Sequence, residues 1–270
     1  MGSPSISQPL IYVYDGPGVG KMSLGEILLT LKDSLGSDYD VRTLGSAEII
    51  EGQWVDDAAL LVMPGGADIP YMRYLSGQGN SNIKRYVAQG GKYLGICAGA
   101  YYGSGYVEFD RNGPLEVLGK RELAFFPGKA VGPILAKYQY KDLSGVRAAH
   151  LTWHDHSISS DDLFVYFNGG PYFPHADEFE DVAVLAYYQL DKPQQEKAPA
   201  IIQISYGSGT VILSGVHFEY DPMRLNKQDP YLQPILPQLQ QGNMARKQLI
   251  DALLSALSLN KNESNVQALT

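Results

Sequence analysis

Short apolar runs alternate with segments of helical periodicity in the N-terminal part of the chain. Four of the runs have the length and composition of strands that are buried on both faces. They are residues 10–14, 39–43, 59–63 and 93–96. Helices are expected over 24–35 and 80–89, because apolar positions recur at helical spacing and Gly36 and Gly90 provide stops. The order strand, helix, strand, strand, helix, strand predicts a parallel sheet with helices on both faces.

The pattern changes after residue 111. Short runs rich in Phe and Tyr, separated by glycines and prolines, indicate antiparallel strands and hairpins up to residue 190. Residues 191–199 have the polar, proline-bearing composition of a surface loop. A hairpin is expected from 201–205 and 210–216 across residues 206–209, and an amphipathic helix over 249–257. We therefore predict an α/β fold with a mostly parallel central sheet and an antiparallel β insertion in its second half.

The chain is predicted to form a single domain over residues 10–260. Residues 1–9 are expected to be a disordered N-terminus or a tag remnant, because Gly2-Ser3-Pro4 resembles a cloning sequence. Residues 261–270 are expected to be a polar C-terminal tail. The chain contains no internal repeats.

Composition restricts the partners. The 270 residues include 44% hydrophobic and 19% charged residues, which is ordinary for a soluble globular protein. A net charge of −8 without any cluster of lysines and arginines argues against nucleic acid and anionic membranes. No apolar run approaches the roughly 20 residues of a membrane span, and no signal peptide is visible. A cytoplasmic location is therefore expected, unless the tag remnant replaced an export signal.

Cys97 is the only cysteine of the chain, which excludes an internal disulfide. It lies in the frame Gly95-Ile96-Cys97-Ala98-Gly99, directly after the fourth predicted strand. This is the strand–nucleophile–helix pattern usually met as Gly-x-Ser-x-Gly, in which the glycines allow a strained turn. The position at the start of a helix favours a thiolate. The alternative is a small buried cysteine at a strand–helix turn.

A cysteine nucleophile needs a base and a group that orients the base. His217 follows the predicted strand 210–216, and Glu219 comes two residues later. On an extended segment, residues i and i+2 face the same side, so the carboxylate can lie beside the imidazole. The alternative is a chance His-x-Glu on the surface or in the core.

Other groupings carry weaker signals. The run from His150 to His156 looks like a metal cluster, since His154 and His156 could face one way on a strand, but a third fixed ligand cannot be identified, and an ordinary polar turn is preferred. The glycine-rich turn 15–20 lacks the spacing of a dinucleotide fingerprint. We expect no metal and no cofactor. An aromatic group is more typical of packing than of a substrate cleft: it comprises Tyr101, Tyr102, Phe125, Phe126, Tyr166, Phe167 and Tyr172.

Taken together, these motifs resemble the class I glutamine amidotransferase-like superfamily. A narrower resemblance is to the N-terminal domain of biotin–protein ligases and its stand-alone bacterial relatives, and it spans roughly residues 10 to 225. The segments that carry it are 14–18, 63–71, 95–103, 107–109, 125–128 and 166–170, together with His217-x-Glu219. The resemblance implies a flavodoxin-like fold and an activity on amide bonds.

The resemblance also implies roles for particular residues. Cys97 would be the nucleophile, His217 the general base and Glu219 its orienter. The N–H groups of Gly66 and Ala98 would form an oxyanion hole. The residues expected to contact substrate are Gly65, Asp15, Tyr101, Tyr102, Glu108 and Asn168.

Three departures from the family pattern restrict the function. Tyr101 stands where glutamine-hydrolysing members have Gln, which argues against a glutamine pocket. Phe218 replaces a common Pro between the histidine and the glutamate. No basic, glycine-rich adenylate-binding loop is present, so biotin ligation by this chain alone is not expected.

Two functions remain open on the sequence alone. The first is a thiol hydrolase or amidotransferase that forms a thioester at Cys97, and the intact Cys, His and Glu favour it. The second is a binding or regulatory module with little turnover, which the replacement by Tyr101 favours. In either case the expected partner is a small amide-type molecule, with a homodimer or another protein as a further possibility.

Overall fold

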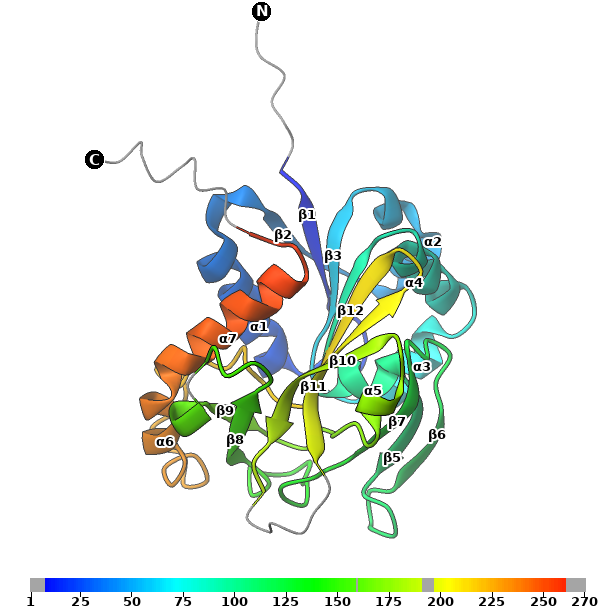
Figure 1. The fold of residues 1–270 in the computed structure, drawn as a ribbon. Coiled ribbons are helices and arrows are strands. Elements are labelled where there is room, and N and C mark those ends of the chain that lie inside the picture. Colours follow the sequence, from blue (N-terminus) through cyan, green and yellow to red (C-terminus); the bar gives the residue numbers. More distant parts are fainter. Residues whose placement is uncertain (1–7, 159, 191–196, 261–270) are drawn as a thin grey trace, which may run out of the picture.

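A computed structural model describes residues 8–158, 160–190 and 197–260 (Figure 1). Most of the expected N-terminal segment and all of the expected tail 261–270 lie outside the described residues. The chain from the first strand to the last helix surrounds a nine-stranded sheet. Its order is β2-β1-β3-β4-β12-β11-β10-β8-β9.

Five neighbouring strands of this sheet are parallel. They are β2 (Asp40–Leu44), β1 (Leu10–Tyr14), β3 (Ala58–Met63), β4 (Lys92–Ile96) and β12 (Gly209–Ser214). Their order is that of flavodoxin-like sheets, in which ligands bind beyond the carboxyl ends of the strands. The predicted fold class is therefore confirmed.

The other four strands extend the same sheet in antiparallel fashion. They are β11 (Ala198–Tyr206), β10 (Val182–Tyr188), β8 (Arg147–Trp153) and β9 (Phe164–Phe167). A second, three-stranded sheet contains β5 (Ser104–Phe109), β6 (Val117–Lys120) and β7 (Phe126–Gly132). Strands β6 to β10 lie within the segment where the aromatic runs predicted antiparallel strands, although β7 pairs with β5 in parallel.

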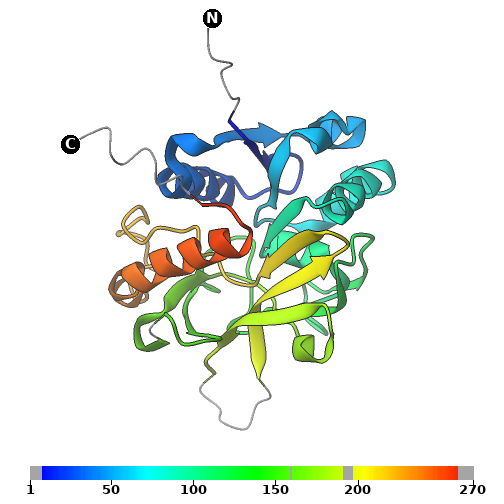
Figure 2. The ribbon, with the colours of Figure 1, turned by 45° about the horizontal axis from the view of Figure 1, so that its top comes forward.

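Helices cover both faces of the main sheet (Figures 1 and 2). One face carries α1 (Lys21–Leu35) and α7 (Asn243–Ala256), which follows α6 (Leu236–Gln241). The other carries α2 (Ser46–Glu51), α3 (Asp68–Leu75), α4 (Gln78–Ala88) and α5 (Ala98–Gly103). Strand alternation separates the two cores: Leu60 and Val62 pack toward α1, whereas Leu61 and Met63 pack toward α4.

Three local predictions were wrong. The sequence pattern missed α2 and α3, which are only six and eight residues long and too short for a clear helical period. It also placed residues 198 and 199 in a loop, whereas β11 begins at Ala198.

The short 3₁₀ turns are η1 (Gly36–Asp38), η2 (Gln53–Asp56), η3 (Ser160–Asp162) and η4 (Ala176–Glu178).

The turn between β4 and α5 is packed too closely for ordinary side chains. The N–H of Gly99 donates a hydrogen bond of 3.2 Å to the carbonyl oxygen of Pro64 at the end of β3. A Cβ atom on Gly99 would lie 2.0 Å from the carbonyl oxygen of Met63. Because that oxygen belongs to the backbone of a central strand, it cannot move aside. Glycine at this position is what lets α5 start directly against β3.

We expect Gly99→Ala to lower the free energy of unfolding by about 1–3 kcal/mol, because the new methyl group overpacks the core. Urea denaturation measures the loss. Gly25→Ala is the matched control: it lies within α1, and a Cβ there would meet nothing within 4 Å. That substitution should stabilise the protein by about 0.5–1 kcal/mol, since alanine favours helix. Equal effects of the two substitutions would contradict the packing argument.

Candidate active site

A cavity of about 350 Å³ opens beyond the carboxyl ends of β3 and β4. The turn after β3 contributes residues 65–70, and the start of α5 contributes Cys97 and Ala98. Tyr166, at the end of β9, and His217 bring the antiparallel half of the sheet to the same cavity. The site therefore lies where the open α/β sheet places ligands.

Cys97 has a backbone conformation that non-glycine residues rarely adopt, with φ 50° and ψ −100°. Its N–H donates to the carbonyl oxygen of Ser214, at 2.8 Å, which fixes the turn to the end of β12. The Sγ atom lies 3.7 Å from the carbonyl oxygen of Asn168. Strained backbone of this kind persists where the surroundings over-determine it, and it is frequent at reactive side chains.

His217 lies beside Cys97 but is not held by the strand that precedes it. β12 ends at Ser214, and the N–H of His217 donates instead to the carbonyl oxygen of Tyr166 in β9, at 2.8 Å. The ring nitrogen Nδ1 lies 2.8 Å from Oε1 of Glu219, and the ring also forms a hydrogen bond with the Cys97 side chain. Since Nδ1 is engaged with Glu219, Nε2 is the nitrogen left for the sulfur. The predicted His217–Glu219 contact is thus present.

Glu219 is fully buried and is held by groups that the sequence pattern did not reveal. Its Oε1 also accepts a hydrogen bond from Ser23 Oγ, at 2.9 Å, and Ser23 Oγ accepts one from the N–H of Gly65, at 2.9 Å. Thr30 Oγ1 donates to the Glu219 carbonyl oxygen at 3.0 Å. Ser23 and Thr30 belong to α1 and are far from Glu219 in sequence, so no local motif could point to them.

The charges around His217 favour its protonated form. Burial opposes the charge on the imidazole, but the carboxylate of Glu219, the sulfur of Cys97 and the hydrogen bonds to both outweigh it. Together they raise the pKa of His217 from 6.5 to about 10. The arrangement therefore keeps an imidazolium beside the sulfur at neutral pH, and such a partner stabilises a thiolate.

Two backbone N–H groups at the cavity are free to act as donors. In the part of the chain that the structure describes, neither the N–H of Gly66 nor that of Ala98 donates a hydrogen bond. Gly66 has φ 151°, and a Cβ there would lie 2.0 Å from the carbonyl oxygen of Gly18. The turn 15–20 is thus bonded to the turn after β3. The N–H of Gly20 donates to the carbonyl oxygen of Gly65 at 2.9 Å, and the N–H of Ala67 donates to that of Gly18 at 2.8 Å.

Three of the six expected substrate contacts line the cavity: Gly65, Tyr101 and Asn168. The hydroxyl of Tyr101 donates to the carbonyl oxygen of Gly169 at 3.1 Å, so the side chain presents its ring to the cavity. Tyr166 also lines the cavity, whereas Phe125, Phe126 and Phe167 belong to the buried cores.

The structure does not bring Asp15, Tyr102 or Glu108 to the cavity lining. Asp15 is exposed, and its N–H joins Leu44 of the neighbouring strand. Tyr102 follows Tyr101 on α5 and so points to another side of the helix, where its hydroxyl donates to Asn80. Glu108 is neutralised by Lys129 at 2.7 Å and Arg111 at 3.1 Å. For these three, contact with a substrate stays a prediction.

The histidine cluster forms no ligand set. β8 ends at Trp153, so His154 and His156 lie in the turn that follows it. Among the residues that the structure describes, no group of three or more His, Cys, Asp or Glu side chains is placed to hold a metal ion.

No helix within the described ranges is long and apolar enough to cross a membrane.

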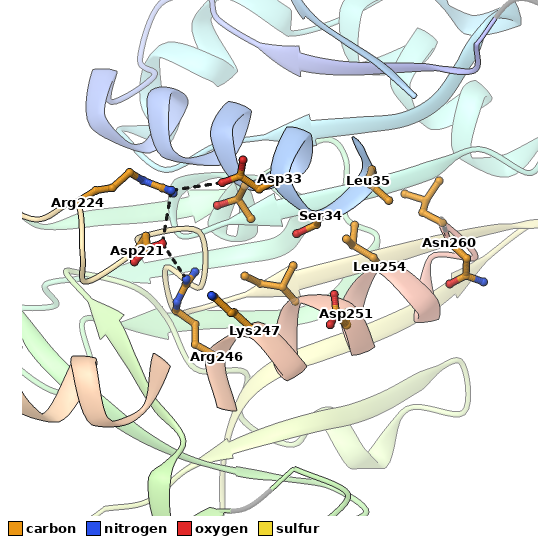
Figure 3. A pocket seen from close by; sticks show the side chains of 13 residues that line it. Asp33, Ser34, Leu35, Asp221, Arg224, Arg246, Lys247, Asp251, Leu254 and Asn260 are labelled. Carbon is orange, nitrogen blue, oxygen red and sulfur yellow. Dashed lines mark hydrogen bonds and ion pairs between the residues drawn. The ribbon is translucent and has the colours of Figure 1, made fainter. Parts of the chain in front are cut away.

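A second cavity, of about 660 Å³, lies between α1 and α7 (Figure 3). Its wall contains Arg246, which is only 3% exposed. Arg246 Nη1 donates to the carbonyl oxygen of Phe218 at 2.8 Å, and Nη2 lies 3.5 Å from Asp221. Figure 3 also shows Arg224 reaching the same aspartate from the outer side. Helix α7 therefore holds the backbone between His217 and Glu219.

Residues 10–270 match the family described as biotin-protein ligase, N terminal. The chain belongs to this family. A Chlamydia muridarum protein described as uncharacterized is 43% identical over 216 residues, 78% of this chain and 81% of that protein. The biotin–protein ligase of Schizosaccharomyces pombe is 35% identical over 211 residues, 78% of this chain.

The match covers 33% of that ligase, so this chain spans about a third of its length. Among solved structures, a catalytic mutant of the GH42 β-galactosidase Gan42B from G. stearothermophilus aligns with a TM-score of 0.51 and 14% identity. The alignment covers 94% of this chain and 31% of the other. A ThuA-like protein from Bacteroides uniformis aligns with a TM-score of 0.46 and 12% identity, over 88% and 95%. At such identities the likeness concerns the fold alone.

Glu219→Gln is expected to lower the pKa of His217 from about 10, because it removes a charge that offsets burial. In the wild type the ring stays protonated well above pH 6.5, so alkylation of Cys97 by iodoacetamide should show no step there. In the variant, a step should appear where the ring now titrates. The measurement is the alkylation rate, from intact mass, over a series of pH values.

The matched control is Glu178→Gln, which removes the charge from the exposed His175–Glu178 pair, at 3.0 Å, away from the cavity. This control should leave the alkylation profile unchanged. A step near pH 6.5 in the wild type would contradict the assignment of an imidazolium to His217.

Arg246→Met should lower the free energy of unfolding by about 1–3 kcal/mol, since it leaves the buried carbonyl of Phe218 without its donor. Arg224→Met should cost less than about 1 kcal/mol, because Arg224 is partly exposed. Both variants remove one arginine from Asp221, and Arg224→Met also removes the ion pair with Glu26 at 2.8 Å. A larger loss for Arg246→Met in chemical denaturation therefore reports the contact with the backbone. Equal losses would mean that this contact contributes little.

Proposed function

We propose that this protein is a thiol-dependent hydrolase or transferase of amide bonds, with Cys97 as nucleophile, His217 as acid and base, and Glu219 as its orienter. One observation carries the proposal. A buried imidazole forms hydrogen bonds both to the sulfur of the chain's only cysteine and to a carboxylate. This is the arrangement that nucleophilic acyl transfer requires.

In the first step the Cys97 sulfur attacks the amide carbonyl, and a C–S bond forms. The oxygen becomes an oxyanion, which the N–H groups of Gly66 and Ala98 would stabilise; one such donor is worth about 3–4 kcal/mol. His217 then gives its proton to the leaving nitrogen, the C–N bond breaks, and a thioester remains on Cys97. The raised pKa of His217 fits this role, because the proton is present before the reaction begins.

In the second step water, or another amine, attacks the thioester carbonyl. His217 removes the proton of the attacking group, the C–S bond breaks, and the sulfur takes back its negative charge beside the imidazolium. Glu219 keeps Nδ1 protonated throughout and holds the ring in place. No cofactor takes part in these steps.

Alkylation tests the nucleophile directly. Cys97 is the only thiol of the chain, so a thiol-selective reagent that adds the mass of one adduct has reacted there. Cys97 is 7% exposed, so an unactivated thiol there should react slowly. We expect fast labelling of the wild type near neutral pH, and a rate at least about tenfold lower in His217→Asn. His175→Asn is the control histidine and should leave the rate unchanged.

Incubation with a panel of small amides, followed by mass spectrometry, separates the two candidate functions. Products that require Cys97, and that Cys97→Ser abolishes, would support the hydrolase or transferase. Ligand binding without product, in a protein whose Cys97 is inert to iodoacetamide, would overturn it in favour of a binding module. The unfolding midpoint of each variant shows that lost activity is not lost structure.

A further inference from the structure

Four aromatic side chains form a continuous row along the cavity, from Cys97 to its mouth. We call the row Tyr101, Phe109, Tyr138 and Tyr140 the aromatic wall. The ring centroids are 5.7 Å apart for Tyr101 and Phe109, 5.9 Å for Phe109 and Tyr138, and 5.0 Å for Tyr138 and Tyr140. All three contacts are edge-to-face, and all four residues line the cavity. Tyr101 begins the row one turn of helix beyond Cys97.

The wall ends in an exposed ring. Tyr140 is 61% exposed, although its ring meets that of Tyr138 edge-to-face. Further apolar side chains complete the lining: they are Met22, Ile69, Pro70 and Val117. The surface beyond the sulfur is therefore largely apolar and neutral, since burial raises the pKa of Tyr138 to about 12.

Charged groups at the cavity are already engaged or solvated. Asp68 lines the cavity, but its carboxylate lies 2.7 Å from Arg121, whose side chain is almost fully buried. Lys21 is exposed at the rim. A free amino acid in the cavity would bring an ammonium and a carboxylate that find no unpaired partners along the wall. Burying such charges unpaired is costly, whereas burying an apolar body against aromatic rings is favourable.

We propose that the aromatic wall binds the acyl part of the substrate, and that this part is an apolar or aromatic body rather than the side chain of glutamine. The inference rests on the proposed function, because it assumes that the scissile carbonyl lies at Cys97. The wall then selects amides of hydrophobic acids. Tyr101 closes the space in which a polar carboxamide would need its partners, since its own hydroxyl is committed to Gly169.

Two chloromethyl ketones with the same reactive group test this selection. One is 1-chloro-4-phenylbutan-2-one, and the other is the glutamine analogue 2-amino-4-oxo-5-chloropentanoic acid. Their second-order rates of labelling at Cys97 are measured by intact mass, beside that of iodoacetamide. We expect the phenyl ketone to react at least about tenfold faster than the glutamine analogue, from the burial of one aromatic ring.

Variants of Tyr140, at the exposed end of the aromatic wall, test whether the wall causes the difference between the two ketone rates. Tyr140→Ala should lower the ratio of the two ketone rates about two- to tenfold, the usual worth of an aromatic contact, and Tyr140→Phe should restore it. Tyr74→Ala is the matched control, because Tyr74 is 49% exposed on α3 and lies outside the cavity lining. It should leave the ratio unchanged.

The outcomes separate the two proposals. Cys97 inert to iodoacetamide and to both ketones would overturn the proposed function itself. Rapid labelling by both ketones, with the glutamine analogue as fast or faster, would overturn the selection and leave the nucleophile in place. A ratio that Tyr140→Ala does not change would remove the wall as its cause.

Discussion

A carboxylate without any exposed surface must be paired, and the burial of Glu219 is the constraint on which the site depends. Its Oε1 accepts from His217 and from Ser23, while Oε2 has no hydrogen-bond partner among the described residues. The negative charge is thus compensated at one oxygen, mainly by the imidazolium. Because Ser23 also accepts from the N–H of Gly65, the same pairing fixes the turn after β3. The same hydrogen bonds therefore compensate the charge of Glu219 and set the geometry of the cavity.

The antiparallel half of the sheet contributes to the site as much as the parallel half. The parallel strands supply Cys97 and the turn after β3, as in other open α/β sheets. Tyr166 in β9 holds the backbone of His217, and the carbonyl oxygen of Asn168 lies 3.7 Å from the sulfur. The wall continues through Phe109 of the small sheet. The family fold is therefore required as a whole, because neither half encloses the sulfur by itself.

Local patterns predicted much of the fold and the centre of the site. Strand β4 and the glycines around Cys97 could be recognised because the turn imposes strict local limits, and His217 and Glu219 because they are only two residues apart. The structure brings these two together by a turn, closed by the N–H of Tyr220 to the carbonyl oxygen of His217 at 3.3 Å, and not by the extended segment that the sequence suggested. Ser23, Thr30 and Arg246 could not be, since their contacts join segments remote in sequence. Asp15, Tyr102 and Glu108 do not line the cavity, because the neighbourhood of a motif does not fix the direction of a side chain, and their contact with a substrate stays a prediction.

The distance along the chain between Cys97 and its partners has a consequence for the nascent protein. His217 and Glu219 leave the ribosome 120 or more residues after the cysteine, and the helix carrying Arg246 follows later still. At about 5–20 residues per second, that interval is roughly 6–24 s. During it the sulfur lacks the neighbouring cation. On the proposed function, reactivity would appear only when the rest of the domain has emerged, which would spare the unfinished chain premature acylation.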